Sequence, residues 1–162
     1  KIIGGGLAVG AFGGRAEVMN YYDPRGGKGR ISHGGTFNAN PVTMAGGVAT
    51  MQELPPEADA RLDALGDRLR EGVKRVLSKS KQAGQVTGLG SLFWIHWTKK
   101  RLSDYRSSRP ADVERPLRTF MGLLNDGVLL TQRGLGCCSL AMTDADVDRF
   151  LEAFGRVVEK EA

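Results

Sequence analysis

Four stretches of the chain carry apolar residues at the spacing of one face of a helix. The first begins at Asn40, a good N-cap residue, with Pro41 in the first turn, where its missing N–H is not needed. The last begins at Thr143, and acidic residues in its first turn suit the positive end of a helix. The pattern predicts helices over residues 40–54, 57–80, 114–125 and 143–158.

Short apolar runs outside these helices indicate strands. We expect strands at residues 2–3, 8–9, 85–87, 91–98, 128–131 and 138–141, with a loop at 104–110 and a turn at 132–136. Because helices and strands alternate over the later two-thirds of the chain, residues 55–162 are predicted to form a small α/β domain. Residues 1–54 begin with a glycine-rich region that differs from this alternation, so we expect them to be the tail of another domain.

The composition, 41% hydrophobic and 25% charged residues over 162 positions, is that of a soluble globular protein. No apolar run approaches the ~20 residues that span a bilayer, and no signal-peptide pattern is present. We therefore expect a cytoplasmic protein with no membrane partner. The formal net charge of +5 is spread along the chain, and the tight basic cluster at 99–101 has no accompanying motif, so no nucleic-acid partner is expected.

The two cysteines, Cys137 and Cys138, are adjacent, a spacing at which disulfide geometry is poorly met. They lie in an apolar stretch, so we expect buried free thiols rather than metal or redox roles. The chain has two histidines, His33 and His96, and no Cys-x-x-Cys pattern, and no metal site is predicted. His33 is expected to be a turn or packing residue.

Three places in the sequence could carry chemistry. Lys1 is either an ordinary surface lysine or, held among glycines and apolar residues, a partly dehydrated amine that can act as a nucleophile. Gly34, Gly35 and Thr36 offer unhindered N–H groups and a hydroxyl that suit a phosphate, although a plain tight turn would look the same. Arg133, in a glycine-flanked turn, is either a solvated turn residue or a bidentate fork for a substrate carboxylate.

Three segments resemble a known family. Residues 1–15, KIIGGGLAVGAFGGR, and residues 34–45, GGTFNANPVTMA, closely resemble the lysine segment and the next segment of class III pyridoxal-phosphate aminotransferases. Residues 140–147, LAMTDADV, resemble the closing strand-to-helix step of that family. The chain looks most like the branch that holds glutamate-1-semialdehyde aminomutase and the β-amino-acid aminotransferases. The resemblance covers nearly the whole chain but less than half of a family member.

The resemblance implies an α/β fold, the C-terminal part of an aspartate-aminotransferase-like enzyme: the end of the large cofactor-binding domain (1–54) and the small α/β domain (55–162). Lys1 would carry pyridoxal 5'-phosphate as a Schiff base and move a proton during catalysis. Gly35 and Thr36 would bind the cofactor phosphate. In the family this threonine comes from the partner subunit, which implies a homodimer with shared active sites. The other cofactor contacts would lie in a missing N-terminal segment of the same protein.

The resemblance also makes Arg133 a discriminator between two activities. The Arg133-Gly134 pattern resembles β-amino-acid aminotransferases more than aminomutases. It favours transfer of an amino group between an amino acid, which could be a β-amino acid, and a keto acid, with Arg133 binding the substrate carboxylate. Glutamate-1-semialdehyde 2,1-aminomutase is the alternative enzyme. A non-catalytic small α/β binding module is the alternative from another class.

Overall fold

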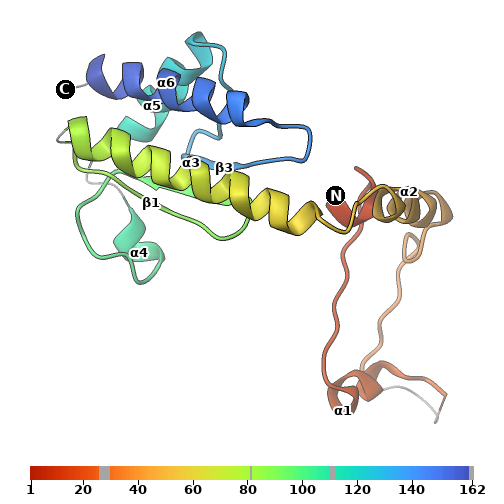
Figure 1. Ribbon diagram of the computed structural model, residues 1–162. Helices are drawn as coiled ribbons and strands as arrows, with labels where there is room; N and C mark the ends of the chain where they lie inside the picture. Colours follow the sequence, from red (N-terminus) through yellow and green to blue (C-terminus); the bar gives the residue numbers. More distant parts are fainter. Residues whose placement is uncertain (26–29, 81, 110–111, 161–162) are drawn as a thin grey trace. The chain divides into compact units, whose positions relative to one another are not determined.

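The computed structural model describes residues 1–25, 30–80, 82–109 and 112–160, which form two compact units (Figure 1). The first unit is Lys1–Pro55 and the second unit is Pro56–Ala162. This division falls one residue from the expected domain boundary. That the first unit is the tail of a larger cofactor-binding domain stays a prediction.

The first unit is built around helix α2 (Pro41–Gln52), which follows the short elements η1 (Ile2–Gly4), α1 (Ala16–Met19) and η2 (Asn20–Tyr22). Helix α2 begins where the sequence predicts. The Asn40 side-chain oxygen accepts hydrogen bonds from the N–H groups of Val42 and Thr43, at 3.1 and 3.2 Å. Because the cap already satisfies these N–H groups, they are not free to bind a ligand.

Glycines allow η1 to lie directly against α2. A Cβ atom added to Gly47 would overlap the carbonyl oxygen of Ile3, and one added to Gly5 would overlap that of Gly46. The contact is therefore made by backbone against backbone, which only residues without a side chain permit.

The strands expected at residues 2–3 and 8–9 are wrong. The N–H groups of Gly4 and Gly6 both donate to the Lys1 carbonyl oxygen, at 3.2 and 2.9 Å, and close a turn instead. Gly6 has a φ of 91°, a conformation that takes the chain out of any extended path. Residues 8–9 have no pairing strand among the described residues of this unit.

The second unit packs helices against a three-stranded sheet. Its elements are, in chain order, α3 (Ala58–Ser80), β1 (Gln85–Thr87), β2 (Leu92–His96), α4 (Tyr105–Ser108), α5 (Arg115–Asn125), β3 (Leu135–Cys137) and α6 (Asp144–Lys160). The sheet is antiparallel in the order β1-β2-β3, so β2 is its central strand. Helices α3 and α6 lie side by side over one face of the sheet (Figure 1), and the three long helices predicted for this region are confirmed.

The core of the second unit lies between α3, α6 and the inner face of the sheet. Phe93 of β2 contacts Phe150 of α6 with ring centroids 5.5 Å apart, and Phe150 stacks on Phe154 at 5.9 Å. Other buried core residues are Leu65, Leu69, Val73, Leu77, Val86, Ile95, Val147, Val157 and Val158. Helix α6 begins directly after Thr143 as predicted, but the capping bonds run from Thr143 to the first turn: its N–H and its hydroxyl both donate to Asp146 Oδ2, at 2.8 Å.

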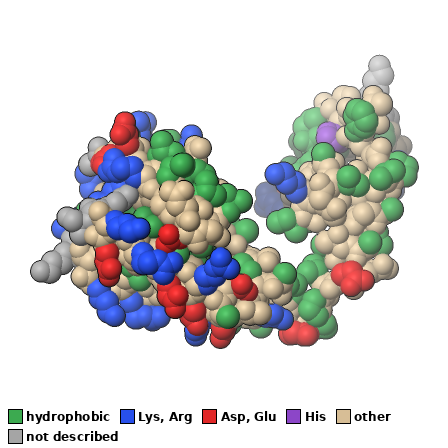
Figure 2. Space-filling model, turned by 90° about the horizontal axis from the view of Figure 1, so that it is seen from above, with side chains coloured by type: hydrophobic (Ala, Val, Ile, Leu, Met, Phe, Trp, Pro, Cys, Tyr) green, Lys and Arg blue, Asp and Glu red, His purple; other side chains and the backbone are tan. Residues whose placement is uncertain are grey.

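Charged side chains cover the solvent face of α3. Figure 2 shows basic and acidic side chains intermixed on one face of the second unit. Arg68 binds Asp148 at 2.7 Å, and Lys74 binds Glu71 at 2.7 Å. The basic residues of α3 thus belong to a solvated, ion-paired helix face, as the sequence indicated. None of the described helices combines the length and the apolar character needed to cross a bilayer.

The segment between α5 and α6 differs most from the prediction. Gly134, with a φ of 82°, reverses the chain early, so β3 forms inside the segment expected to be a turn. Residues 128–131 form no strand among the described residues, because the N–H of Val128 donates back to the Leu123 carbonyl oxygen at the end of α5. The strand expected at residues 138–141 is not formed either. The N–H of Cys138 donates to the Ser91 carbonyl oxygen, and the chain leaves the sheet after this bond.

Two further expectations need correction. The loop expected at 104–110 contains α4, because Asp104 and Ser107 form a reciprocal capping box that nucleates a helical turn. Position 110, the last of the expected loop, lies outside the described residues.

Both cysteines are free thiols, but only Cys138 is buried, and Cys137 is exposed. Burial, and then the neighbouring Cys137, raises the pKa of the Cys138 thiol, with Arg70 acting in the opposite direction.

The outer face of β2, opposite the core, carries Trp94 and His96. Their rings stack with centroids 5.1 Å apart, and His96 Nε2 lies 2.9 Å from the Thr87 hydroxyl. His96 is buried. Burial lowers the pKa of its imidazole below the ordinary value of 6.5, while a hydrogen bond to the Ser108 backbone acts weakly in the opposite direction.

Replacing Gly47 with Ala should weaken the packing of η1 on α2, because the new methyl group meets fixed backbone. We expect a loss of about 1–3 kcal/mol and faster hydrogen exchange of the α2 amides, measured by mass spectrometry on the full-length protein. Gly155→Ala in α6 is the control, since nothing lies within 4 Å of its added Cβ. Unchanged exchange in α2 of the Gly47→Ala protein would contradict this packing.

The His96 environment predicts a pH dependence of stability. Because the folded pKa lies below the unfolded value of 6.5, the unfolded chain binds the proton more readily. Stability from this site is therefore complete above pH 6.5 and falls as the pH drops below it. His96→Gln should flatten the dependence of the unfolding free energy on pH below about 6.5, where the imidazole of the unfolded chain takes up its proton. A slope in the His96→Gln protein equal to that of the wild type would refute the assignment.

Candidate active site

Lys1 lies at the start of the turn that packs on α2. Its carbonyl oxygen accepts two hydrogen bonds, so the backbone at this residue is fixed by Gly4 and Gly6. Its side chain is exposed and forms no ion pair or hydrogen bond with the described residues. The structure thus combines a fixed backbone with an amine that is free to react.

Thr36 begins the turn that leads into α2. The turn is closed by hydrogen bonds from the N–H of Asn38 to the Gly35 carbonyl oxygen, at 3.0 Å, and from the N–H of Asn40 to that of Phe37, at 3.2 Å. The N–H groups of Gly35, Thr36 and Phe37 and the Thr36 hydroxyl have no acceptor among the described residues. These exposed donors, and not the capped start of α2, are the groups that could hold an anion.

An aromatic cluster supports the Thr36 turn from one side. The His33 ring meets Phe12 and Tyr22 edge-on, with centroids 5.0 and 6.0 Å apart. His33 Nε2 also lies 3.4 Å from Asn38 Nδ2 in the turn. His33 therefore has the packing role expected from the sequence. Asn38 was missed, because nothing in the sequence separates it from other polar turn residues.

A cavity of about 330 Å³ lies between the chain that follows the Lys1 turn and the Thr36 turn. Its lining residues are Ala8, Val9, Gly10, His33, Phe37, Asn38, Ala39, Asn40, Thr43 and Met44. The structure thus brings the two family-like segments together around α2, although Lys1, Gly35 and Thr36 do not themselves line this cavity.

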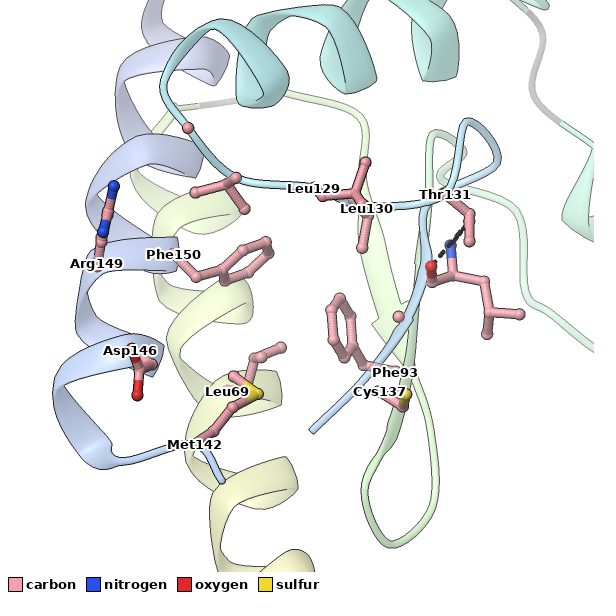
Figure 3. Close-up of a pocket in the computed structure, with 14 residues that line it drawn as sticks. Leu69, Phe93, Leu129, Leu130, Thr131, Cys137, Met142, Asp146, Arg149 and Phe150 are labelled. Carbon is pink, nitrogen blue, oxygen red and sulfur yellow. Dashed lines mark hydrogen bonds between the residues drawn. The ribbon is translucent and has the colours of Figure 1, made fainter. Parts of the chain in front are cut away.

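Arg133 lies in the second unit, in the turn that precedes β3. The N–H of Gly134 donates to the Thr131 carbonyl oxygen at 2.9 Å, and Thr131 Oγ1 bonds both the N–H and the carbonyl oxygen of Leu135, at 2.9 and 2.8 Å (Figure 3). The Arg133 guanidinium is exposed and has no ion pair or hydrogen bond within the described residues. A free, positively charged fork on a closed turn can bind a carboxylate through two parallel hydrogen bonds.

Arg133 also borders a cavity of about 390 Å³ on the outer side of the sheet. Its walls include Trp94 and His96 from β2, Tyr105 and Ser108 from α4, and Arg109. Trp94 is a second residue that the sequence did not single out as functional. The alternation along β2 is the signal that could have found it, because Trp94 falls between the core residues Phe93 and Ile95 and must face the other way.

A larger cavity, about 600 Å³, opens on the inner side of the same turn (Figure 3). Leu69, Phe93 and Phe150 form its apolar wall, and Asp146 and Arg149 of α6 lie at its edge. None of the residues predicted to act in a site lines it. Among the described residues, no group of three or more His, Cys, Asp or Glu side chains could hold a metal ion.

Comparison with known proteins adds independent evidence. The family model "Aminotransferase class-III" matches residues 1–158. The chain is 43% identical to a β-phenylalanine transaminase of Variovorax paradoxus over 162 residues, which are 98% of this chain and 36% of that protein. It is 36% identical to glutamate-1-semialdehyde 2,1-aminomutase 2 of Brevibacillus brevis over 163 residues, 99% of this chain and 37% of that protein. The chain thus spans little more than a third of the length of these relatives.

Solved structures agree with these matches. An omega-transaminase from Sphaerobacter thermophilus superposes with a TM-score of 0.89 and 47% identity, over 98% of this chain and 37% of that one. A transaminase with PLP bound superposes with a TM-score of 0.83 and 32% identity, over 99% of this chain and 38% of that one. These structures confirm the predicted α/β fold of a C-terminal aminotransferase portion. On this evidence the chain belongs to the class-III aminotransferase family.

Proposed function

We propose that this chain is the C-terminal part of a pyridoxal-phosphate-dependent transaminase that moves an amino group between an amino acid and a keto acid. The family match over residues 1–158 is the observation that carries the proposal. The geometry supports it, because Lys1 has a fixed backbone and a free amine. Neither the family match nor the geometry at Lys1 supports the alternative of a non-catalytic binding module.

The residues of the first unit fit the cofactor. Lys1 Nζ would hold the reactive carbon of one cofactor, and the free N–H groups of Gly35 and Thr36, with the Thr36 hydroxyl, would bind the phosphate of the cofactor held by the partner subunit. When bound, pyridoxal 5'-phosphate supplies an electron sink that stabilises negative charge on the substrate carbon beside the amine. Lys1 Nζ would take the proton from that carbon and deliver it elsewhere on the reacting system.

Arg133 supports an amino acid as the substrate. Its guanidinium would bind the substrate carboxylate bidentately, because no described acidic side chain competes for it. The V. paradoxus relative is a β-phenylalanine transaminase, and we propose that β-amino acids are among the substrates here. The aminomutase relative keeps an internal amino shift on glutamate-1-semialdehyde as the second candidate activity.

The surface of the first unit supports a homodimer that shares its active sites. Ile2, Phe37, Val42 and Val48 are between 57% and 83% exposed, an unusual apolar exposure for one small unit. We propose that the N-terminal remainder of the protein and the partner subunit cover these side chains. In that assembly the Thr36 turn would serve the cofactor of the partner.

Lys1→Ala in the full-length protein should abolish covalent attachment of the cofactor. Borohydride reduction followed by peptide mass spectrometry should place the pyridoxyl group on the Lys1 peptide of the wild type and leave it absent from the variant. Transamination should fall about 10²- to 10⁴-fold through loss of the proton-transfer group. Lys79→Ala, an exposed lysine at the end of α3, is the control and should retain both label and activity. A label that persists in the Lys1→Ala protein would rule this residue out.

Arg133→Ala should weaken substrates that carry a carboxylate and spare amines that lack one. We expect kcat/KM for a β-amino acid to fall about 10- to 100-fold, as for a lost hydrogen bond between charged groups. Arg109→Ala, at the same cavity, controls for the loss of one positive charge. Substrate profiling with a β-amino acid, an α-amino acid and glutamate-1-semialdehyde separates transaminase from aminomutase. An unchanged profile would remove Arg133 from the site.

A further inference from the structure

The turn that carries Arg133 is tied to β2 at Gly134 and at the Arg133 carbonyl oxygen, but not by the Arg133 side chain. The N–H of Ile95 donates to the Gly134 carbonyl oxygen at 3.0 Å, and a Cβ atom on Gly134 would lie 2.8 Å from the Ile95 carbonyl oxygen. Among the described residues, Arg133 itself takes part in one hydrogen bond. Its carbonyl oxygen accepts the indole N–H of Trp94 at 2.7 Å.

Trp94 is well placed to make this bond rigid. In the sheet it pairs with Thr87 on β1 and with Leu135 on β3, so its backbone is held from both sides. Its half-buried ring stacks on His96, with an interplanar angle of 27°. His96 is itself buried and bonded to Thr87. The indole therefore cannot turn away without disturbing the outer face of the sheet.

Trp94 and Arg133 also border the same cavity of about 390 Å³. A fixed carbonyl at Arg133 limits the rotation of its peptide, and this limits the directions in which the side chain can leave the backbone. A guanidinium presented in one direction loses less conformational freedom when it binds a carboxylate.

We propose that Trp94 is a positioning residue for Arg133: its indole N–H fixes the turn so that the guanidinium meets the substrate carboxylate in a set orientation. The inference rests on the proposed function, in which Arg133 binds that carboxylate. Trp94 acts through Arg133 and needs no contact with the reacting atoms.

The test is Trp94→Phe in the full-length holoenzyme, which removes the N–H donor and keeps an aromatic ring over His96. KM for a β-amino acid should rise about fivefold, as for one lost hydrogen bond, with kcat nearly unchanged, because the loss affects binding of substrate and transition state equally. The kinetics of an amine without a carboxylate should not change. A purely structural role would lower stability or activity for both substrates.

Trp94→Met, which also lacks the donor, must likewise raise KM for the β-amino acid and leave the kinetics of the amine unchanged. Circular dichroism checks the fold of both variants. Leu92→Ala is the matched control. Leu92 lies two residues earlier on the same face of β2, is exposed, and has no side-chain hydrogen bond to the Arg133 turn. It should keep wild-type kinetics with both substrates.

The double variant Trp94→Phe/Arg133→Ala separates this inference from the proposed function. If Trp94 acts through Arg133, adding Trp94→Phe to Arg133→Ala should not raise KM further. A full additional fivefold increase, or no effect of Trp94→Phe alone, would overturn the positioning role while Arg133 keeps its own. If Arg133→Ala alone leaves carboxylate substrates unaffected, the proposed function of Arg133 fails, and the role of Trp94 fails with it.

Discussion

Close approach of two backbones, at points where only glycine fits, holds both candidate elements of the site. In the first unit, Gly47 allows α2 to lie on the carbonyl of Ile3, and this contact fixes the turn that begins at Lys1. In the second unit, Gly134 lies against the carbonyl of Ile95 and fixes the turn that carries Arg133. Backbone contacts of this kind leave the functional side chain free while its point of attachment stays rigid. That is the arrangement a reactive amine and a carboxylate fork require.

Strand β2 extends the same logic across the sheet. Its inner residues, Phe93 and Ile95, belong to the core with α3 and α6. Its outer residue Trp94 meets the Arg133 turn. A strand that alternates in this way connects the buried core of the unit to the proposed substrate-binding residue through a hydrogen bond from Trp94. Orientation of Arg133 is thus a consequence of core packing, although Arg133 itself is exposed.

The sequence predicts the elements whose signals are local. The Asn40 cap, the long periodic stripe of α3 and the start of α6 after Thr143 each depend on residues a few positions apart, and each is confirmed. The position of β3 was predicted wrongly, because it depends on a positive φ at Gly134 and on contacts with a strand some forty residues away in the sequence. For the same reason Lys1, Thr36 and Arg133 could be named from motifs, whereas the support from Asn38 and Trp94 appears only when distant segments meet.

The two units divide the proposed chemistry. Lys1, Gly35 and Thr36 belong to the first unit, and Arg133 with Trp94 belongs to the second. The groups proposed for cofactor chemistry are backbone donors, the Thr36 hydroxyl and the amine of Lys1, and these would serve any substrate that reacts through its amino group. The group proposed for the carboxylate is one side chain on a turn, and a turn can change its residues without disturbing the core beneath it. A family that contains both transaminases and aminomutases could therefore retain the first set while the second changes, and under the proposed function the Arg133 turn, and not the Lys1 turn, would distinguish the two activities.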